Sequence, residues 1–541
     1  MPSDDETPPV RYDRAFHSIP NIVRVNARRW PDVVAIKEGS REWTYAALER
    51  DVIAGIRGMV AAGVEPGDRI ALCGPNSASW IIVALSIQGA GAVLVPINTR
   101  FKGQEVHHAL RRSGAEMLVT VTDFLGNDYV SFVRAVDPEF VAPGRVIVYS
   151  GAVPPDAGSW SDLVRHGLDS CEEEAASARL DAVGPDDISD IMFTSGTTGL
   201  PKGVALTHGQ SLRAFGWYAS VLTFRFGDRY PIIPPFFHSF GYKAGWMACL
   251  LHGVTIYPVA VFDAESFAQL AERERISILM APPAVFHDLL ELTRSRNVRL
   301  PELRVVMISA AAVPPALFRR VRDELDVPVM ASSYGQTECT ALATTTHPGT
   351  DTLDDIATTV GRAALDVDIR VVDASGTPLP PGRAGEVLIR GYTVMRGYWN
   401  DPDATAEVVD AEGWLHSGDI GVLDDRGLLR IVDRKKDMYI AGGFNVYPAE
   451  VEDILAAYPA ISDIAVVGVP DPRMGEVGAA FVVPKPGTTF DQANFLAWAR
   501  RQIANFKVPA HVVVLAALPR NAGGKVAKNS LREQFGTPRG R

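Results

Sequence analysis

The sequence predicts an α/β protein, with a large N-terminal domain of layered α/β architecture that includes a small β-rich subdomain, and a small, mobile α+β domain at the C-terminus. Between about residues 43 and 306, short apolar runs alternate with helical patterns, as in folds with largely parallel sheets. From about residue 366, short alternating strands are separated by Gly, Pro and Asp turns, which indicates the β-rich subdomain. At 541 residues the chain is too long for one ordinary core, so we expect at least two domains.

Six apolar runs of the N-terminal domain predict strands: RIALCG, AVLVPI, MLVTV, RVIVYS, ISILMA and LRVVMIS. The first two lie between Arg69 and Arg100, in a stretch that has no formal charge and is long enough to span a membrane. Asn76, Gln88 and a glycine-containing turn at residues 89–91 divide this stretch into strand, helix and strand. We therefore predict a buried βαβ unit there and no transmembrane segment.

A charged run, DRKKD at residues 433–437, predicts the boundary between the two domains because it separates two patterned segments. The N-terminal domain then covers residues 1–432 and the C-terminal domain residues 438–541. For the C-terminal domain we expect a helix near residues 449–458, strands over IAVVGV and AAFVVP, a helix around residues 491–504 and a terminal strand over HVVVL.

Composition excludes several classes of function. The net charge is −11 and no basic block is present, which argues against nucleic-acid binding. The four cysteines show no CxxC spacing and no neighbouring His cluster, so neither a zinc site nor a disulfide framework is expected, and scattered thiols suit the cytoplasm.

The acidic start, MPSDDETPPVRYDR, lacks the layout of an export signal and is expected to be disordered. The sequence leaves the oligomeric state open, and a homodimer is one of the states that it allows.

One loop stands out for its chemistry. The predicted strand at residues 188–193 leads into TSGTTG, residues 194–199, and Lys202 follows. Such a loop can direct several backbone N–H groups and hydroxyls at one point, as a phosphate-binding loop does. An ordinary polar turn has the same composition, so composition alone leaves both readings open. A Walker A loop is disfavoured, because the GK[ST] ending is missing and the VAL after Gly203 predicts another strand.

The stretch FTSGTTGLPKGV is similar to the phosphate-binding signature of the adenylate-forming superfamily of acyl-CoA synthetases, aryl-CoA ligases, luciferases and peptide-synthetase adenylation domains. Five further blocks follow in the order of that family: PFFHSFG at 235–241, YGQTE at 334–338, GWLHSGD at 413–419, DRKKDMYIAGGFNVYPAEVE at 433–452 and LPRNAGGKVAK at 518–528. The resemblance covers nearly the whole chain. It is closest to actinobacterial fatty-acyl-type ligases, which include the ligase for the propionate side chain of a steroid-derived indanedione.

The resemblance implies an ATP-dependent acyl-CoA synthetase that requires Mg2+. A carboxylate attacks the α-phosphate of ATP, pyrophosphate leaves, and the acyl group passes from acyl-AMP to the thiol of coenzyme A. The N-terminal domain is then expected to bind ATP and the acid. The C-terminal domain is expected to act as a lid that rotates about Lys436 in the hinge between the two half-reactions.

The resemblance also assigns the ATP site. Its residues are Thr194, Ser195, Gly196, Thr197, Thr198, Gly199, Lys202, Tyr334, Gly335, Gln336, Thr337, Asp419, Arg434 and Lys525. Lys525 and Glu338 are the implied catalytic residues. Lys525 would bridge the acid carboxylate and the α-phosphate, while Glu338 would hold Mg2+ together with the Thr194 hydroxyl. Tyr334 would face adenine, and Asp419 and Arg434 would reach the ribose.

The acyl side and the coenzyme A side are assigned in the same way. The implied acyl pocket and gate consist of His238, Ser239, Phe240, Lys243, Ala244, Ala310 and Ala311, and Gly442 and Gly443 would line the thiol channel. His238 resembles a gate residue and not an acid or base, because no triad partner is evident. Two departures from the family are the alanines of SAAAV, residues 309–313, and Asp433, which replaces a frequent Gly.

The FFHSF block, residues 236–240, contains no carboxylate to pair with a substrate ammonium, so an amino-acid substrate is not expected. The segments GYKAGWMACL and APPAVFHDLL favour a hydrophobic acid, either fatty, aryl or alicyclic. Lys243 either reaches solvent along its aliphatic chain, the commoner arrangement, or meets a carbonyl of an oxygenated substrate.

Three alternative functions stay open. An acyl-AMP ligase would deliver the acyl group to a carrier protein, and an aryl-CoA ligase would differ in its acid. The GGFNVYP segment, residues 442–448, favours coenzyme A as the acceptor. A catalytically silent binding protein of the same fold is the third alternative, and the presence of Lys525, Glu338 and Asp419 argues against it.

Overall fold

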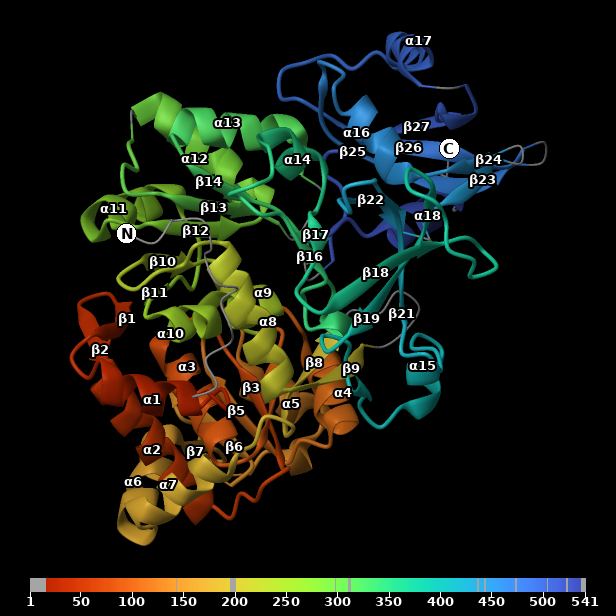
Figure 1. The fold of residues 1–541 in the computed structure, drawn as a ribbon. Coiled ribbons are helices and arrows are strands. Elements are labelled where there is room, and N and C mark those ends of the chain that lie inside the picture. The colour runs from red at the N-terminus through yellow and green to blue at the C-terminus, as the bar shows by residue number, and fades with distance from the viewer. Residues whose placement is uncertain are drawn as a thin grey trace. The chain divides into compact units, whose positions relative to one another are not determined.

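A mixed sheet with helices on both faces forms the base of the N-terminal part in the computed structural model (Figure 1). Its strand order is β20 (Gly397–Tyr398), β9 (Lys202–Thr207), β8 (Ile188–Thr194), β4 (Val93–Ile97), β3 (Arg69–Cys73), β5 (Met117–Val121), β6 (Val146–Ser150) and β7 (Gly158–Ser159). The strands from β8 to β7 pair in parallel, whereas β9 pairs antiparallel with both β8 and β20.

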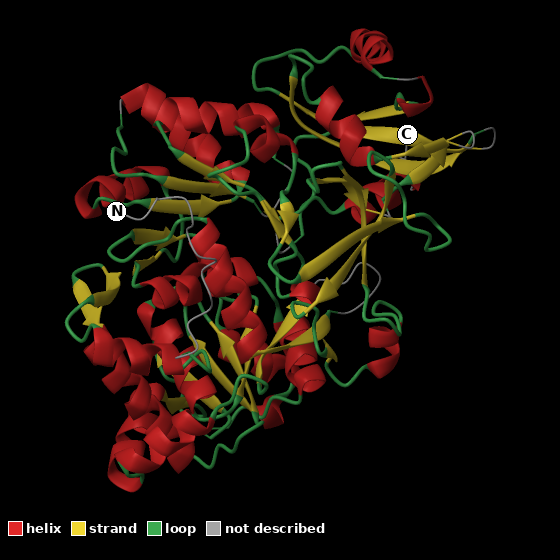
Figure 2. Cartoon of the chain, in the orientation of Figure 1, coloured by secondary structure: helices red, strands yellow, loops and turns green. Residues whose placement is uncertain are grey.

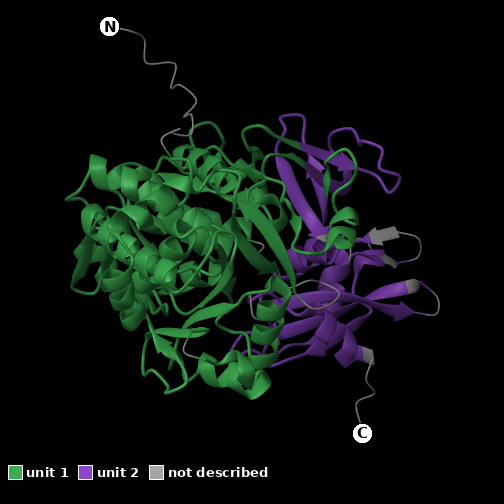
Figure 3. Cartoon of the chain, turned by 90° about the horizontal axis from the view of Figure 1, so that it is seen from below, with its two compact units in different colours: residues 1–368, 390–415 green, residues 369–389, 416–541 purple. Residues whose placement is uncertain are grey.

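The structure describes residues 16–142, 144–194, 201–296, 298–309, 313–434, 437–441, 444–471, 474–503, 505–521 and 524–536. The chain divides into two compact units, shown in separate colours in Figure 3. Unit 1 comprises residues 1–368 and 390–415, and unit 2 comprises residues 369–389 and 416–541.

Helices pack on the mixed sheet of unit 1 and on one another (Figure 2). They are α1 (Asn21–Arg29), α2 (Tyr45–Ala61), α3 (Ala78–Gly89), α4 (Gly103–Ser113), α5 (Tyr129–Val136), α6 (Trp160–Ser170), α7 (Glu173–Ala182) and α8 (His208–Val221). Side chains of α4 and α5 form one hydrophobic cluster with β3 to β6. Helix α3 is buried along almost its whole length, which explains why its sequence is apolar on every side.

Unit 1 also contains two smaller sheets. One has the order β10 (Arg229–Ile232), β11 (Thr255–Pro258), β1 (Val34–Glu38) and β2 (Arg41–Thr44), and the other the order β12 (Ile278–Ala281), β13 (Val305–Ile308) and β14 (Val329–Ala331). Helices α11 (Ala264–Glu274), α12 (Pro283–Arg296) and α13 (Pro315–Leu325) build a core with β12 to β14. Between β10 and β11 the chain forms α9 (Ser239–Gly241), a π-helical turn (Tyr242–Met247) and α10 (Ala248–His252).

A short antiparallel sheet completes unit 1. Its order is β15 (Ser333–Tyr334), β16 (Thr344–Thr345) and β17 (Arg362–Ala363). A 3-10 turn (Thr337–Cys339) follows β15, and helices α14 (Leu353–Thr358) and α15 (Pro402–Ala406) lie farther along the chain. The predicted YGQTE block begins in β15 and ends in this 3-10 turn.

Unit 2 combines two sheets. One has the order β18 (Val367–Val372), β19 (Ala384–Gly391), β21 (Leu415–Leu423) and β22 (Leu429–Arg434). The other has the order β24 (Phe444–Val446), β23 (Tyr439–Ala441), β26 (Gly475–Pro484) and β25 (Ile461–Asp471), with β27 (His511–Val514) parallel to β26. Helices α16 (Pro448–Leu455), α17 (Gln492–Gln502) and α18 (Lys528–Gly536) and a 3-10 turn (Asn505–Lys507) complete the unit.

The predicted strands and helices are confirmed. The six apolar runs form β3, β4, β5, β6, β12 and β13, and the uncharged stretch between Arg69 and Arg100 folds as β3, α3 and β4 with parallel strands. Among the residues that the structure describes, no helix combines the length and apolar character needed to cross a membrane. The C-terminal helices and strands also lie where they were expected, within a few residues.

The division into compact units does not follow the predicted domain boundary at residues 433–437. Unit 2 takes in most of the β-rich segment after residue 368, so the predicted hinge lies inside unit 2. The hinge residue Lys436 lies outside the described residues. The hinge at residues 433–437 stays a prediction.

Candidate active site

The predicted phosphate loop begins and ends on two paired strands. Thr194 is the last residue of β8 and Lys202 the first of β9, and the two are Cα partners in the antiparallel pairing. The loop between them is therefore closed at its base, as a hairpin of this kind requires. The predicted residues Ser195, Gly196, Thr197, Thr198 and Gly199 lie outside the described residues.

The predicted metal ligand Glu338 lies in a tightly packed turn after β15. A Cβ atom on Gly335 would lie 2.4 Å from the backbone carbon of Ala341, so only glycine fits at this position. The backbone oxygen of Glu338 accepts a hydrogen bond from Met395 N at 2.8 Å. Thr340 Oγ1 donates to the carbonyl oxygen of Thr393 at 2.6 Å. The turn is thus held against the segment that leads into β20.

Tyr398 joins this turn to the phosphate-loop lysine. Its hydroxyl donates a hydrogen bond to Glu338 Oε1 at 3.0 Å. The Lys202 ammonium lies 4.9 Å from the centroid of the Tyr398 ring and 3.9 Å from Glu407 Oε2. Burial, and then the charge of Glu338, raises the pKa of Tyr398, so its phenol stays protonated and acts as a donor.

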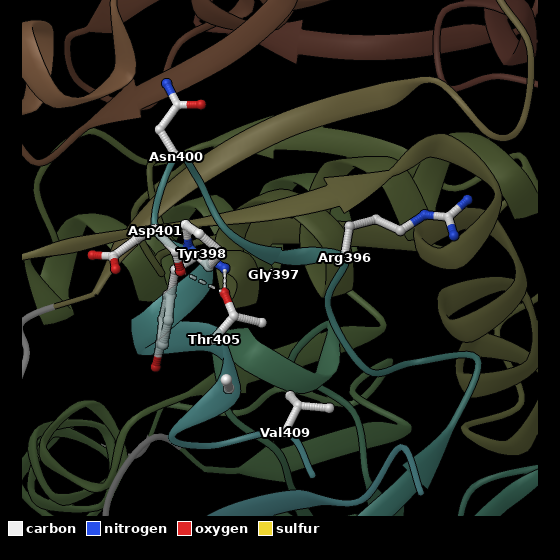
Figure 4. Close-up of a pocket in the computed structure, with 9 residues that line it drawn as sticks. Arg396, Gly397, Tyr398, Asn400, Asp401, Thr405 and Val409 are labelled. Carbon is white, nitrogen blue, oxygen red and sulfur yellow. Dashed lines mark hydrogen bonds between the residues drawn. The ribbon is translucent and has the colours of Figure 1, made fainter. Parts of the chain in front are cut away.

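Sequence reasoning did not find Tyr398. It lies 60 residues from Glu338 in the chain, and no spacing rule connects the two. Figure 4 shows Tyr398 beside a surface groove whose lining also includes Asp401 and Thr405. Thr405 Oγ1 accepts a hydrogen bond from Tyr398 N at 2.9 Å and donates one to the carbonyl oxygen of Asp401 at 2.8 Å (Figure 4).

The donor set around Glu338 fits a magnesium ion that arrives with a nucleotide. Within the described parts of the chain, no group of three or more His, Cys, Asp and Glu side chains could hold a metal ion. Mg2+ in nucleotide-using enzymes is commonly bound by one or two carboxylates plus substrate phosphates, so a resident cage is not needed. Glu338 is half-buried and carries a carboxylate of this kind, and its role and that of the Thr194 hydroxyl as metal ligands stay predictions.

The two predicted ribose-binding residues lie opposite each other in unit 2. Asp419 on β21 and Arg434 on β22 are Cα partners across an antiparallel pair. Asp419 follows Gly418, whose φ of +69° favours glycine. This part of β21 is fixed by Ser417, whose Oγ accepts from Asp419 N at 3.1 Å and donates to the carbonyl oxygen of Val387 at 2.6 Å. The Asp419 side chain is buried.

Asp433, which stands where a glycine was expected, has a structural role. Its side chain is buried, and Oδ2 accepts a hydrogen bond from Ala449 N at 2.9 Å. Ala449 lies in the first turn of α16, where backbone N–H groups have no partner within the helix. Asp433 therefore caps α16 from a neighbouring strand, a contact that glycine could not make.

The predicted adenylation lysine lies on an exposed hairpin of unit 2. Arg520 and Val526 form the bridge that closes it, and Lys525 N donates to Asn521 Oδ1 at 3.0 Å. The Lys525 residue is exposed. Thr194, Lys202 and Glu338 belong to unit 1, so the meeting of Lys525 with those residues stays a prediction. The predicted coenzyme A residues Gly442 and Gly443 lie outside the described residues.

The predicted acyl gate begins at α9. His238 is exposed, and its Nδ1 accepts a hydrogen bond from Phe240 N at 3.2 Å. Ser239 is buried, and its hydroxyl contacts Met192 Sδ on β8 at 3.1 Å. The gate segment is thereby joined to the strand that leads into the phosphate loop. Ala310 and Ala311 lie outside the described residues.

The expectation that Lys243 reaches solvent is wrong. Its side chain is fully buried in the π-helical turn, where Nζ lies 3.0 Å from Asp190 Oδ1 and donates to Ser211 Oγ at 2.9 Å. Burial lowers the pKa of Lys243, and the Asp190 carboxylate acts in the opposite direction. In this structure the ammonium meets protein oxygens and no solvent. Ala244 is buried beside it.

The π-helical turn is anchored to the same strand region by a second contact. Gln88 Nε2 donates to the Tyr242 hydroxyl at 2.7 Å and to the carbonyl oxygen of Ser189 at 2.9 Å. The Tyr242 ring stacks on Trp246 with a centroid separation of 4.7 Å. Gly245 has non-helical dihedral angles, φ −92° and ψ −109°, which marks the point where the helix is interrupted.

Comparison with known proteins decides the family. The sequence profile of AMP-binding enzymes matches residues 23–399, and the profile of the AMP-binding enzyme C-terminal domain matches residues 450–525. The chain belongs to the AMP-binding enzyme family. The predicted membership of the adenylate-forming superfamily is confirmed.

This AMP-binding enzyme is similar to acyl-CoA ligases over nearly its whole length. A Mycobacterium tuberculosis protein named 3-[(3aS,4S,7aS)-7a-methyl-1,5-dioxo-octahydro-1H-inden-4-yl]propanoyl:CoA ligase is 43% identical over 519 residues, which cover 96% of this chain and 99% of the relative. A feruloyl-CoA synthase of Amycolatopsis is 37% identical over 519 residues, covering 94% of this chain and 97% of the relative.

A solved structure supports the same fold. ATP-bound MatB from Rhodopseudomonas palustris matches with a TM-score of 0.83 and 28% identity, covering 95% of this chain and 99% of that chain. The predicted α/β fold class is confirmed. As an AMP-forming acyl-CoA ligase, this AMP-binding enzyme uses ATP and coenzyme A to convert a carboxylic acid, through its acyl-adenylate, into a thioester.

Proposed function

We propose that this acyl-CoA ligase activates an alicyclic propionate, a short acid side chain on an oxygenated, fused-ring body. The observation that carries the proposal is the 43% identity, over 96% of this chain, to the relative named for the dioxo-indane propionate. The segment that carries the predicted pocket residues Lys243 and Ala244 is consistent with a hydrophobic acid, because residues 241–250 are all buried and include several aromatic and aliphatic side chains.

The chain's own residues are proposed to divide the work of adenylation between them. Thr194 and Lys202 are proposed to contact phosphates, which their pairing at the base of the loop supports, and Glu338 is proposed to hold a metal on them. Mg2+, when bound, would supply charge neutralisation on the phosphate oxygens. Lys525 is proposed to offset the repulsion between the acid carboxylate and the α-phosphate, two anions that must come within bonding distance.

The remaining assignments are proposals of the same kind. Tyr334, Gly335, Gln336 and Thr337 are proposed to form the adenine-binding turn, and Asp419 and Arg434 the ribose contact. The cross-strand register of Asp419 and Arg434 supports a shared ligand. Rotation about Lys436 is proposed to withdraw Lys525 from the active site and to bring the thiol channel at Gly442 and Gly443 to it. A cytoplasmic location and a homodimer are likewise proposals.

A substrate panel tests the proposed acid. The full chain would be assayed for pyrophosphate release and acyl-CoA formation with the dioxo-indane propionate, straight-chain fatty acids of increasing length, and ferulate. We expect kcat/KM to be roughly ten-fold or more higher for the dioxo-indane propionate, the size of effect that a few pocket contacts provide. Equal or higher values for the fatty acids or for ferulate would contradict the proposed substrate.

The acceptor is tested in the same assay. With coenzyme A omitted, the acyl-adenylate should remain on the enzyme, and addition of coenzyme A should release the thioester. Transfer to a pantetheine-bearing carrier protein in preference to coenzyme A would identify the alternative acyl-AMP ligase. Failure to release pyrophosphate with every acid would instead point to a silent binding protein.

A further inference from the structure

Tyr398 touches both residues that are proposed to act on the triphosphate. Its hydroxyl donates to Glu338 Oε1 at 3.0 Å, and its ring lies under the Lys202 ammonium at 4.9 Å from the centroid. The three residues come from β20, from the turn after β15 and from the first position of β9. One side chain thus contacts two groups that the chain supplies from separate elements.

The backbone holds Tyr398 in this place from two sides. Tyr398 pairs with Val204 on β9, two residues beyond Lys202, which fixes the ring beside the lysine. Met395 N donates to the backbone oxygen of Glu338 at 2.8 Å, which fixes the turn beside the same segment. Thr405 Oγ1 accepts from Tyr398 N and so fixes the end of the short strand. The two contacts of the side chain are therefore built into the fold.

The two contacts differ in their chemistry. A phenol that donates to a carboxylate restricts the rotation of that carboxylate. It also gives one carboxylate oxygen a hydrogen-bond partner when no metal is bound. An ammonium within about 6 Å of an aromatic centroid is attracted to the ring face, and an aromatic ring keeps this attraction without the hydroxyl. A substitution that removes only the hydroxyl can therefore separate the two effects.

We infer that Tyr398 is a positioning residue, which orients the Glu338 carboxylate for the metal ion on ATP and the Lys202 ammonium for the phosphates. The inference rests on the proposed roles of Glu338 and Lys202. Tyr398 itself is not proposed to contact the reacting atoms. Its effect is expected on metal affinity through the hydroxyl and on nucleotide affinity through the ring.

Two substitutions at the same position separate the contacts. Tyr398→Phe removes the hydrogen bond to Glu338 and keeps the ring over Lys202, whereas Tyr398→Leu removes both. Tyr392→Phe is the matched control, because it deletes a hydroxyl in the same segment, where the ring packs on Arg213 at 3.9 Å. All three variants would be made in the full chain, and thermal melting would establish that each is folded.

Binding measurements without turnover provide the readout. Mn2+ affinity would be measured by electron paramagnetic resonance in the presence of a non-hydrolysable ATP analogue, and affinity for the same analogue by calorimetry in EDTA. For Tyr398→Phe we expect roughly a ten-fold loss of Mn2+ affinity, as a hydrogen bond to a charged group implies, with metal-free nucleotide affinity unchanged. For Tyr398→Leu we expect a further loss of metal-free nucleotide affinity of about three-fold. Tyr392→Phe should match the wild type in both.

Glu338→Gln distinguishes failure of the inference from failure of the proposed function. If Glu338→Gln loses Mn2+ affinity and Tyr398→Phe does not, the positioning role is overturned while the role of Glu338 stands. If Glu338→Gln binds Mn2+ like the wild type, both the proposed role of Glu338 and the inference that rests on it are overturned. Equal losses of metal and metal-free nucleotide affinity in Tyr398→Phe would indicate a general structural effect and would also overturn the inference.

Discussion

The Lys243 ammonium lies 3.0 Å from the Asp190 carboxylate, and both side chains are completely buried. Asp190 belongs to β8, the strand that ends at Thr194, and Lys243 to the π-helical turn within the predicted acyl pocket and gate. The ion pair therefore ties the strand of the phosphate loop to the gate segment. Charges buried in this way cost free energy to desolvate, and they are stable only as long as both partners are present.

Removal of one partner should be far more damaging than removal of both. Lys243→Met leaves the Asp190 carboxylate buried without its cation, and we expect the free energy of unfolding to fall by about 3–5 kcal/mol. The double variant Asp190→Leu/Lys243→Met should recover most of that loss. Urea unfolding followed by tryptophan fluorescence measures both.

A surface lysine supplies the control for that experiment. Lys37 lies 3.0 Å from carboxylate oxygens of both Glu42 and Glu274, and its side chain is 24% exposed. We expect Lys37→Met to cost about 1 kcal/mol, well below the loss for Lys243→Met, because Lys37 remains partly open to solvent. Equal losses for Lys37→Met and Lys243→Met would show that the burial of the Asp190 pair has no special cost.

Lys525→Ala should abolish the adenylation step and spare the second step. Without the ammonium, repulsion between the acid carboxylate and the α-phosphate is no longer offset, so we expect pyrophosphate release to fall by at least about 100-fold. Thioester formation from a supplied acyl-adenylate should stay within about two-fold of the wild type, because that step needs the lysine out of the site. Lys485→Ala, at another exposed lysine of unit 2, is the control. Loss of both steps would contradict the assigned role.

Gly335→Ala should weaken nucleotide binding. The added Cβ would lie 2.4 Å from the backbone carbon of Ala341, so the turn that carries Glu338 has to shift. We expect ATP affinity, measured by calorimetry, to fall about ten-fold or more, since such overpacking typically costs 1–3 kcal/mol. Gly349→Ala is the matched control, because a Cβ there meets no atom within 4 Å. An unchanged affinity in Gly335→Ala would exclude the turn from the nucleotide site.

His208 should make the protein less stable in mild acid. Ile19 N donates to His208 Nδ1 at 3.2 Å, and burial, then the Lys243 charge, lowers the pKa of His208 to about 3. In the unfolded chain the histidine pKa is about 6.5, so the unfolded state takes up the proton first as the pH falls. The contribution of neutral His208 to stability is therefore complete above about pH 6.5, and it is lost progressively as the pH falls from that value to about pH 3.

The size of the effect follows from that window. At pH 5 the contribution of His208 should be smaller than at pH 7 by about 2 kcal/mol, at about 1.4 kcal/mol per pH unit. His208→Gln should remove this part of the pH dependence of unfolding, whereas His166→Gln, at an exposed histidine, should leave it in place. If His208→Gln showed the same loss between pH 7 and 5 as the wild type, the buried ring would not be the cause.

Much of the fold could be predicted from local patterns. The strand, loop and strand around Thr194 and Lys202 are encoded by an apolar run, a glycine-rich loop and a second apolar run, all within about 20 residues. The parallel β3 and β4 were predictable for the same reason. In such cases the sequence pattern and the structural element that it encodes occupy the same short segment of the chain, so the pattern alone is enough to predict the element.

The contacts that were missed are all between residues distant in the chain. Lys243 pairs with Asp190, 53 residues earlier by their numbers, and nothing in the apolar segment around Lys243 reveals that a carboxylate lies opposite. Tyr398 and Glu338 are 60 residues apart in the chain, and no local pattern connects them. Asp433 was noted as a departure, but its partner Ala449 depends on how α16 packs. Side-chain pairing across elements is set by tertiary packing, which a single sequence does not display.

The contact of Asp433 with Ala449 bears on the proposed rotation about Lys436. The two residues lie on opposite sides of Lys436 in the chain, so a swing about that residue has to pull the N–H of Ala449 away from the Asp433 carboxylate. Breaking a hydrogen bond to a buried charged group costs about 1.5–3 kcal/mol unless a new partner replaces it. A glycine at this position could not form such a bond. The bond from Ala449 to Asp433 would therefore stabilise the arrangement in which it is formed. That arrangement would be more populated, and rotation away from it would be slower.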